Sequence, residues 1–267
     1  MSAAVGDEST TGMMDERSNT PHDRPMTLIE HLEELRIRLT RSIIGLLAAT
    51  LAGFIFVDPL LVLLLRPTGH MKLTTLTVLE PFLVKVKIAF LFGLAVSMPW
   101  IMYQVYAFIS PALTDNERRR TIPLALLAGI LFATGLVFGY VFVLPISTHW
   151  LLAQAGSQFQ VLLTANAYIS YVLFFLLIVG GTFETPLVIL SLAMLGLVTP
   201  QTLRREWRIA YMIIAAIAVF GTPDWSPVTM ILVAVPMALL YEFSIVLCRI
   251  VIRPAAAKPA QAAHTGG

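Results

Sequence analysis

The sequence predicts an all-α membrane protein that crosses the bilayer several times. Hydrophobic residues make up 57% of the 267-residue chain and charged residues only 13%, whereas a soluble domain is about 45–50% apolar and about 25% charged. The charges are also segregated, since residues 121–183 contain no Asp, Glu, Lys or Arg. A spanning helix needs about 20 consecutive apolar residues, so these runs predict membrane spans.

Polar tails flank the apolar region. Residues 1–25 are mixed in charge and poor in large apolar residues, which predicts a disordered tail, and we expect no removable signal peptide because no apolar segment with a small-residue cleavage site follows. Residues 254–267 predict a second tail, which leaves 26–253 as the membrane domain. The single cysteine, Cys248, excludes an internal disulfide and supplies no metal or redox motif.

Six spans are expected in order along the chain. The first four are apolar runs at about 39–57, 86–109, 121–144 and 168–197, with an uncharged outer cap at 145–167 between the last two. The final two, about 209–222 and 228–241, are short: about fourteen residues reach roughly 21 Å, less than the roughly 30 Å hydrocarbon core. One broken hairpin that does not fully cross is the alternative to two short spans that thin the bilayer. Arginines on one side of both segments favour six spans.

Lysine and arginine are distributed unevenly between the two sides that six spans would create. Of the 18 Lys and Arg residues, four fall on one side and the remaining 14 on the other. The four are Arg66, Lys72, Lys85 and Lys87. Because cytoplasmic loops carry the excess of positive charge, both termini are expected in the cytoplasm.

Small residues recur in the third span. Gly135 and Gly139 are four residues apart, a spacing that lets helix backbones approach closely in membranes. The spacing is common in membrane helices, so it predicts helix packing and no further function.

Two polar segments lie beside the spans. The first, "MTLIEHLEELRIRL" at 26–39, has a leucine stripe and a charged face on which Glu34 and Arg38 form a favourable i,i+4 pair. An ordinary interfacial helix would explain it. The second, at 103–120, places the aromatic residues Tyr103, Tyr106 and Phe108 before Glu117 and three arginines. A helix cap and topology anchors explain most of this segment, but an acidic residue beside aromatics could also bind a cationic peptide.

A single carboxyl group interrupts the fourth span. Glu184 lies between Gly180-Gly181 and Pro186, and the proline, which lacks an N–H, predicts a kink. An ionised carboxylate is costly in the bilayer, so we expect a neutral Glu184. It could bond within its own helix or to a neighbouring span, or it could serve a partner's span or ion-coupled transport.

The sequence weighs against two other functional classes. Many secondary transporters contain inverted repeats, and no internal repeat is found here. An intramembrane enzyme would need a nucleophile or metal ligands within the spans, but Gly-x-Ser-x-Gly and His-Glu-x-x-His are absent and all histidines lie outside the expected spans. The histidines are His22, His31, His70, His149 and His264. We therefore expect no enzymatic activity, no metal site and no cofactor, and the residues alone leave transporter and receptor open.

Five segments of the sequence form a recognisable series: "HLEELRIRL", "LEPFLVKVKIAF", "SMPWIMYQVYAFISPALTDNERR", "GTFETPLVIL" and "TPDWSPVTM". Taken together, they resemble the TatC family, the large integral subunit of the twin-arginine protein translocase. The resemblance covers about 26–253 in order. Two departures are Tyr106, where a Trp is usual, and the "TPDWSP" turn, which is tighter than the usual double-proline version.

The resemblance implies six transmembrane helices, the last two short, in a curved, cup-like bundle in the cytoplasmic (inner) membrane, with both termini in the cytoplasm. It implies a receptor for the Arg-Arg signal peptides of folded cargo. It also implies assembly with single-span partners of the TatA/TatB type into an oligomeric complex, transport driven by the proton-motive force, and no nucleic-acid partner.

The resemblance also assigns residues by motif. Glu34 and Glu117 match the glutamates that bind the twin arginines, and Arg36 and Phe108 match other positions of that signal-binding region, to which we add Tyr103 from the aromatic group. Glu184 matches the buried glutamate linked to partner contacts. Thr222 and Asp224, in the "TPDWSP" turn, are expected at the partner interface.

Overall fold

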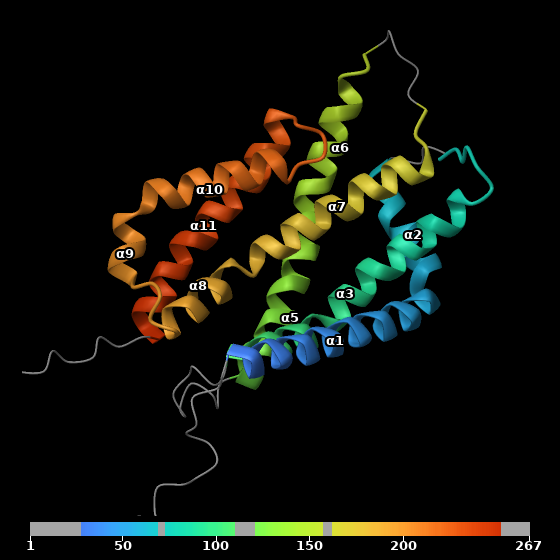
Figure 1. The fold of residues 1–267 in the computed structure, drawn as a ribbon. Coiled ribbons are helices and arrows are strands. Elements are labelled where there is room, and N and C mark those ends of the chain that lie inside the picture. Colours follow the sequence, from blue (N-terminus) through green and yellow to red (C-terminus); the bar gives the residue numbers. More distant parts are fainter. Residues whose placement is uncertain (1–27, 69–72, 110–120, 157–161, 252–267) are drawn as a thin grey trace, which may run out of the picture. The chain divides into compact units, whose positions relative to one another are not determined.

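The computed structural model describes residues 28–68, 73–109, 121–156 and 162–251 (Figure 1). These residues are helical apart from connecting turns and one isolated bridge between Thr74 and Thr164. The all-α prediction is therefore confirmed. The chain divides into two compact units, Met1–Ile37 and Arg38–Gly267, and each is described by itself.

The first helical segment is longer than the predicted span. Helix α1 runs over Leu28–Gly53, and it continues through the 3-10 turn η1 (Phe54–Phe56), α2 (Val57–Leu65) and the 3-10 turn η2 (Arg66–Thr68). The expected span at 39–57 thus lies inside one 40-residue helical segment, Ile29–Thr68. The charged arm before the span has helical periodicity of its own, so no break separates arm and span.

The second and third spans also extend beyond their apolar runs. Helix α3 covers Glu80–Ile109, and α5 (Thr121–Phe138) continues through the π-helical turn η4 (Gly139–Val143) into α6 (Leu144–Ala153). Helix α6 occupies part of the segment that we expected to be a cap. Pro145 does not stop it, because proline in the first turn of a helix removes only an N–H that has no helical partner.

The fourth span is broken at Glu184. Helix α7 runs over Ala165–Phe183 and α8 over Thr185–Met194, with Glu184 as the residue between them. Pro186 lies in the first turn of α8. The break predicted from Pro186 is confirmed, and it places a carboxyl group inside a membrane-spanning segment.

The last two helices differ in length. After the short α9 (Pro200–Arg205), α10 covers 14 residues, Trp207–Phe220, and α11 covers 25 residues, Pro227–Val251. The expectation of a short helix holds for α10 but is wrong for α11, which is long and apolar enough to span a membrane. The prediction ended the last span at Glu242, yet a charged residue at the membrane surface does not end a helix.

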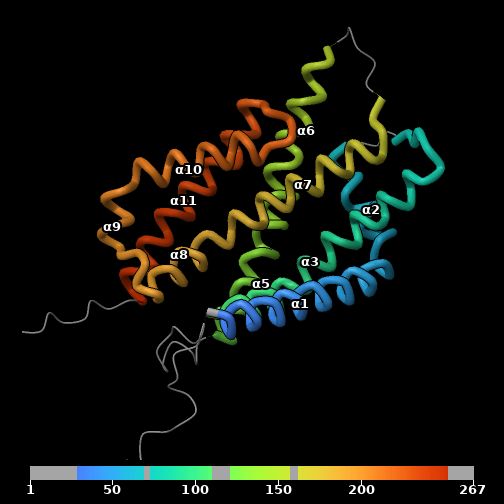
Figure 2. Tube along the Cα trace, in the orientation of Figure 1, coloured from blue at the N-terminus to red at the C-terminus, as the bar shows by residue number. Residues whose placement is uncertain are grey.

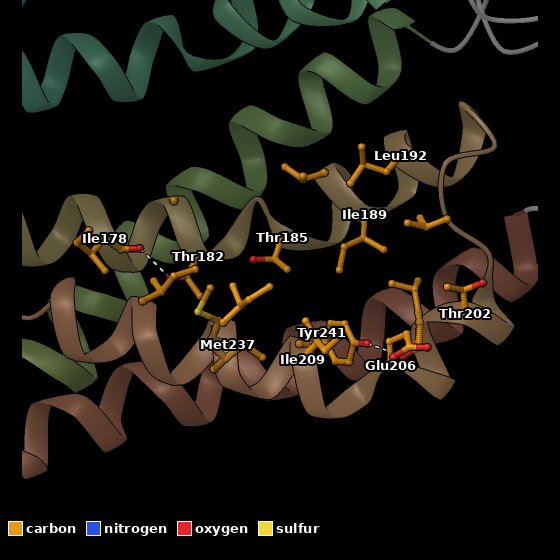
Figure 3. Close-up of a pocket in the computed structure, with 18 of the residues that line it drawn as sticks. Ile178, Thr182, Thr185, Ile189, Leu192, Thr202, Glu206, Ile209, Met237 and Tyr241 are labelled. Carbon is orange, nitrogen blue, oxygen red and sulfur yellow. Dashed lines mark hydrogen bonds between the residues drawn. The ribbon is translucent and has the colours of Figure 1, made fainter.

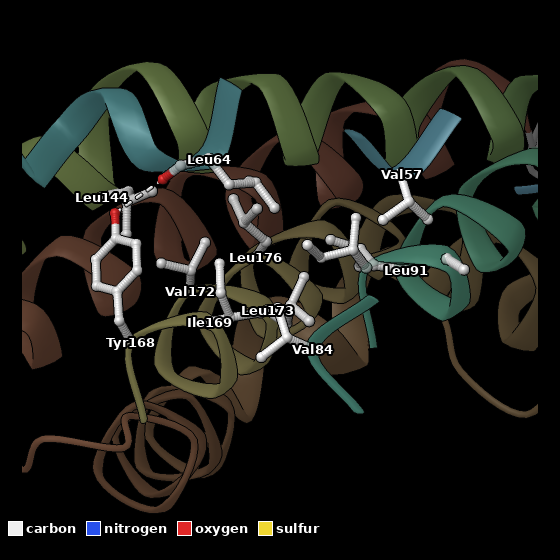
Figure 4. Packing of buried hydrophobic residues seen from close by; sticks show 12 residues of the cluster. Val57, Leu64, Val84, Leu91, Leu144, Tyr168, Ile169, Val172, Leu173 and Leu176 are labelled. Atoms are coloured by element: carbon white, nitrogen blue, oxygen red, sulfur yellow. Dashed lines mark hydrogen bonds between the residues drawn. The ribbon is translucent and has the colours of Figure 1, made fainter. Parts of the chain in front are cut away.

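Helix α7 is at the centre of the packing. It contacts α3, α5 and α11, and it is the most buried of the apolar spans in the described part of the chain (Figure 2). A cluster of buried hydrophobic side chains from α2, α3, α6 and α7, which includes Tyr168, forms the main core (Figure 4). A Cβ added at Gly135 of α5 would lie 2.9 Å from the Cα of Gly180 in α7. The predicted packing role of the small residues is therefore confirmed.

Candidate functional site

Glu34 and Arg36 lie in α1, within the unit Met1–Ile37. Arg36 is exposed and pairs with Glu33 at 3.5 Å, while Glu34 is half-buried. Glu117 lies outside the described residues. The proposed carboxylate partners for the signal peptide therefore come from one helical segment and from the connection between α3 and α5.

The aromatic residues lie in the last two turns of α3. Tyr103 and Phe108 are half-buried, whereas Tyr106 is buried. The ring of Tyr103 lies 6.0 Å from that of Trp100, and the indole N–H of Trp100 donates to the carbonyl of Arg41 at 3.1 Å. This contact fixes the end of α3 against the second half of α1, within the unit Arg38–Gly267.

Tyr106 connects α3 with α8. Its hydroxyl is 3.3 Å from that of Ser191, which also bonds to the carbonyl of Leu187. Ser191 lies in α8, seven residues after Glu184, the residue at the break between α7 and α8. Glu184 is 6% exposed, and neither of its carboxylate oxygens has a hydrogen-bond partner among the described residues.

Thr222 and Asp224 lie in the turn between α10 and α11. Thr222 donates to the carbonyl of Ala218 at 3.0 Å, and Asp224 accepts from the hydroxyl of Thr229 at 2.7 Å. These bonds are local and hold the turn, in which Trp225 takes a positive φ of 49°. The neighbouring Gly221 packs on Ile178 of α7. Ile178 lies six residues before Glu184, which is roughly 9 Å along the helix axis.

One buried carboxylate was not identified as a site from the sequence. Glu80, at the start of α3, accepts the backbone N–H of Leu76 at 2.7 Å and that of Asn166 at 2.8 Å. The adjacent bridge between Thr74 and Thr164 joins the same two loops. Glu80 therefore connects the loop before α3 with the start of α7. Its position at a helix N-terminus, followed by Pro81, was the available signal, but the distant partner was not predictable.

No group of three His, Cys, Asp or Glu side chains gathers within metal-binding distance in the described ranges. The polar residues instead occupy helix ends, a helix break and a turn. The fold and these positions define a multi-span helical membrane protein.

Comparison with known proteins identifies the family. Residues 30–236 match the family model of the Sec-independent protein translocase protein (TatC). The chain is 35% identical over 234 residues to a Sec-independent protein translocase protein TatC from Carboxydothermus hydrogenoformans, covering 86% of this chain and 95% of that one. It is 37% identical over 231 residues to the TatC of Deinococcus radiodurans, covering 84% and 86%.

Solved structures agree with the sequence comparison. The fold matches a crystal structure of the twin arginine translocase receptor TatC with a TM-score of 0.71 and 35% identity, covering 83% of this chain and 99% of that one. A second crystal structure of this receptor, in DDM, matches with a TM-score of 0.73 and 36% identity over 82% and 99% of the two chains.

The chain belongs to the TatC family. It is accordingly a membrane component of a Sec-independent protein translocase and not an enzyme. This assignment does not favour the ion-coupled transporter that the residues alone left open.

Proposed function

We propose that the protein is the receptor and scaffold of a twin-arginine translocase. In this role it binds the Arg-Arg signal peptides of folded cargo and recruits single-span partners of the TatA/TatB type for export driven by the proton-motive force. The observation that carries the proposal is the extent of the family match, because residues 30–236 include Glu34, Glu117 and Glu184. The related solved structures are described as twin arginine translocase receptors.

The chemistry of the signal site follows from the residue types. A guanidinium group presents its N–H donors in a planar fork that fits a carboxylate with two parallel hydrogen bonds, which the ammonium of lysine cannot reproduce. Glu34 and Glu117 would each take one arginine of the pair, while Phe108 and Tyr103 would contact the apolar part of the peptide. Arg36 and the arginines after Glu117 would repel cationic peptides that are wrongly placed.

The test on the ligand side compares two signal peptides. A labelled twin-arginine peptide and its Lys-Lys variant are incubated with membranes that contain the full chain. The proposal expects capture of the chain with the Arg-Arg peptide at least tenfold above the Lys-Lys peptide. Equal capture of both would contradict recognition of the guanidinium pair and leave only a general attraction for positive charge.

The proposed orientation places both termini in the cytoplasm of a cell whose inner membrane holds the protein. The asymmetry of lysine and arginine supports it. Cysteines introduced at Ala155 and Trp225 should then react with an impermeant reagent added from outside the cell, and a cysteine at Gly267 should not. External labelling at Gly267 without labelling at Trp225 would mean that the proposed topology of the final hairpin is wrong.

The proposed partner site centres on Glu184. Because its buried carboxyl has no hydrogen-bond partner in the part of the chain that the structure describes, it can offer a hydrogen bond to a polar residue in the span of another protein. Thr222 and Asp224 would contact the same class of partner just beyond the C-terminal end of α10. Partners that co-purify with the wild-type chain but not with Glu184→Ala would support this role.

A further inference from the structure

Two apolar surfaces of the unit Arg38–Gly267 are open to the surroundings of the protein. One is a groove of about 760 Å³ whose walls come from α7, α8, α9, α10 and α11 (Figure 3). Its lining is mainly aliphatic and suits a lipid chain and an apolar helix equally. The other is the loop before α3, residues 73–79, and the position of this loop defines the medium that it contacts.

The loop exposes large apolar side chains and carries no charge. Its sequence, "LTTLTVL", consists of leucine, valine and threonine alone. Leu76 is 77% exposed, Val78 is fully exposed and Leu79 is 59% exposed, and Phe82 in the first turn of α3 is 57% exposed. We call these four residues the loop patch. Apolar side chains that gather on an exposed surface in this way mark a contact with a membrane or a protein.

Backbone hydrogen bonds hold the loop against the protein. The N–H of Thr74 donates to the carbonyl of Leu163 at 2.9 Å, and the carbonyl of Thr74 accepts from the N–H of Ala165 at 2.9 Å. The N–H of Leu76 donates to the carboxylate of Glu80 at 2.7 Å. A loop in water can leave such groups to the solvent, whereas a segment at an apolar surface needs partners for them within the protein. The backbone of this loop meets that requirement at these positions.

The length of α3 gives the depth of the loop in the bilayer. The 30 residues of α3 reach about 45 Å, which matches the roughly 40–45 Å thickness of a bilayer with its headgroup regions. The N-terminal end of α3 therefore reaches the headgroup region on the side of the membrane that is poor in lysine and arginine. Because the Glu80 carboxylate bonds to Leu76, the loop stays at this level.

An ion pair gives the same depth independently. Lys85 of α3 pairs with Asp58 of α2 at 2.8 Å, and the two side chains are 45% and 78% exposed. Charged groups are costly in hydrocarbon, so this exposed pair lies at the boundary of the hydrocarbon core. Glu80 precedes Lys85 by five residues, which is roughly 7.5 Å along the helix axis. Each headgroup region is about 5–7.5 Å thick, so the loop lies among the headgroups.

An apolar stripe connects the loop patch with the membrane-facing side of α3. Leu79, Leu83 and Phe90 follow one another at spacings of four and seven residues, and the N–H of Leu83 bonds to the carbonyl of Leu79 at 3.1 Å, so the three residues share one helical face. Leu83 and Phe90 are each 42% exposed. The ammonium of Lys87 bonds to Ser170 of α7 at 2.7 Å and is thereby drawn away from the stripe. The lipid-facing surface of the span therefore continues without charge into the loop.

We propose that residues 73–79 are an interfacial membrane anchor, in which the loop patch lies among the lipid headgroups and inserts its apolar side chains toward the acyl chains. The proposed orientation makes this the outer leaflet, but the contact with lipid does not depend on the orientation or on signal recognition. The anchor fixes the depth of α3 in the bilayer. It thereby fixes the level of the other end of α3, where Tyr103 and Phe108 lie.

The first experiment measures the depth of the loop. A nitroxide label on Val78→Cys is studied in the full chain, reconstituted in vesicles of phosphatidylethanolamine and phosphatidylglycerol, while the native Cys248 is fully buried. Collision rates of the label with oxygen and with a water-soluble nickel chelate report its depth. We expect a depth of about 5–10 Å, where interfacial apolar groups lie.

Two further labels calibrate the measurement. Gln201 is exposed in α9 and supplies the position in water, and Val96 is exposed in the middle of α3 and supplies the position in hydrocarbon. The Val78 label should fall between them. A label at Val78 that meets the nickel chelate as often as the label at Gln201 would overturn the anchor.

Two pairs of variants test whether the apolar side chains hold the loop in place. With the label moved to Leu79→Cys, Leu76→Asn with Val78→Asn should raise the collision rate with the nickel chelate severalfold. The matched control is Thr75→Asn with Thr77→Asn, because both threonines are exposed in the same loop, and it should leave the rate unchanged. An unchanged rate in the first pair, or an equal rise in both pairs, would contradict anchoring by the apolar side chains.

Crosslinking in native membranes tests the identity of the contact. A photoreactive residue at position 78 should form an adduct with lipid. An adduct mainly with a second copy of the chain or with another protein would make the loop patch a protein interface and overturn the anchor. The depth measurement uses the purified chain alone, so its result is independent of whether the protein is a signal receptor.

Discussion

Two glutamates of this protein are buried to the same extent but differ in their hydrogen bonding and in their position in the fold. Glu80 and Glu184 are each 6% exposed. Glu80 accepts one backbone N–H group from the loop before α3 and one from the first turn of α7, whereas Glu184 has no hydrogen-bond partner among the described residues. Nearly all buried polar groups in proteins are satisfied. The comparison therefore assigns Glu80 to the structure of the fold and supports the proposal that Glu184 interacts with another protein.

The surroundings of the two residues fit this division. Glu80 sits where the Thr74–Thr164 bridge and the bond from Lys87 to Ser170 at 2.7 Å join α3 to the start of α7. Glu184 sits where the span itself is broken. A break in a helix frees backbone groups and lowers the stability of the fold. Such local losses of stability are common at functional positions.

The largest expected effect is the loss of export in Glu184→Ala. The variant removes the unpartnered carboxyl, so the thermal midpoint should stay the same or rise while cargo export falls at least tenfold. Binding of the twin-arginine peptide should not change. Export and thermal unfolding of one membrane preparation measure both quantities, and normal export would make Glu184 a structural residue like Glu80.

The next effect is a loss of stability in Glu80→Ala. Two backbone N–H groups lose their acceptor, and the loop before α3 loses its connection to α7. We expect the thermal midpoint to fall by several degrees, and the loop at 73–79 to become accessible to proteases. Thr77→Val provides a control in the same loop. A midpoint equal to that of the wild type would remove the structural role from Glu80.

Replacing each glutamate with glutamine sharpens the comparison. Glu184→Gln keeps a hydrogen-bonding group and should retain co-purification of partners, because the carboxyl is expected to act in its neutral form. Glu80→Gln keeps one acceptor oxygen of two and should be intermediate in stability between wild type and Glu80→Ala. Failure of Glu184→Gln as complete as that of Glu184→Ala would require an ionised or titrating carboxylate.

The smallest expected effect concerns the contact between Tyr106 and Ser191. Hydrogen bonds between membrane helices contribute about 0.6 kcal/mol on average, so Tyr106→Phe should lower stability by about that amount. Combined with Ser191→Ala, the two changes should be non-additive in a double-mutant cycle of thermal unfolding. Strict additivity would show that the two hydroxyls do not stabilise each other.

Local features of the sequence were sufficient for much of the fold. The break at Glu184 follows from Pro186, and the close packing at Gly135 follows from the spacing of small residues, because both effects act over one or two helical turns. The length of α11 does not follow from local features, because the charged Glu242 predicts the end of a span, whereas in the structure its carboxylate pairs with Arg204 of α9 and the helix continues.

Contacts between segments that are distant in the sequence could not be predicted. The two donors to Glu80 lie four and 86 residues away in the chain. Nearly every residue has a backbone N–H group, so the sequence does not show which of them bond to Glu80. The groove needs five helices to form its walls. Of the signal-site residues, Glu34 and Glu117 were assigned by family resemblance, and their joint role stays a prediction.

The most direct test of the receptor assignment is a double-mutant cycle between the chain and the signal peptide. Affinities for the Arg-Arg peptide and its Lys-Lys variant are measured with wild type, Glu34→Ala, Glu117→Ala and the double variant in membranes. A charge-assisted hydrogen bond contributes about 1.5–3 kcal/mol, so each single variant should bind the Arg-Arg peptide about ten- to a hundredfold more weakly and the Lys-Lys peptide nearly as before. A double variant that binds the Arg-Arg peptide as tightly as wild type, and still prefers it, would contradict the assignment.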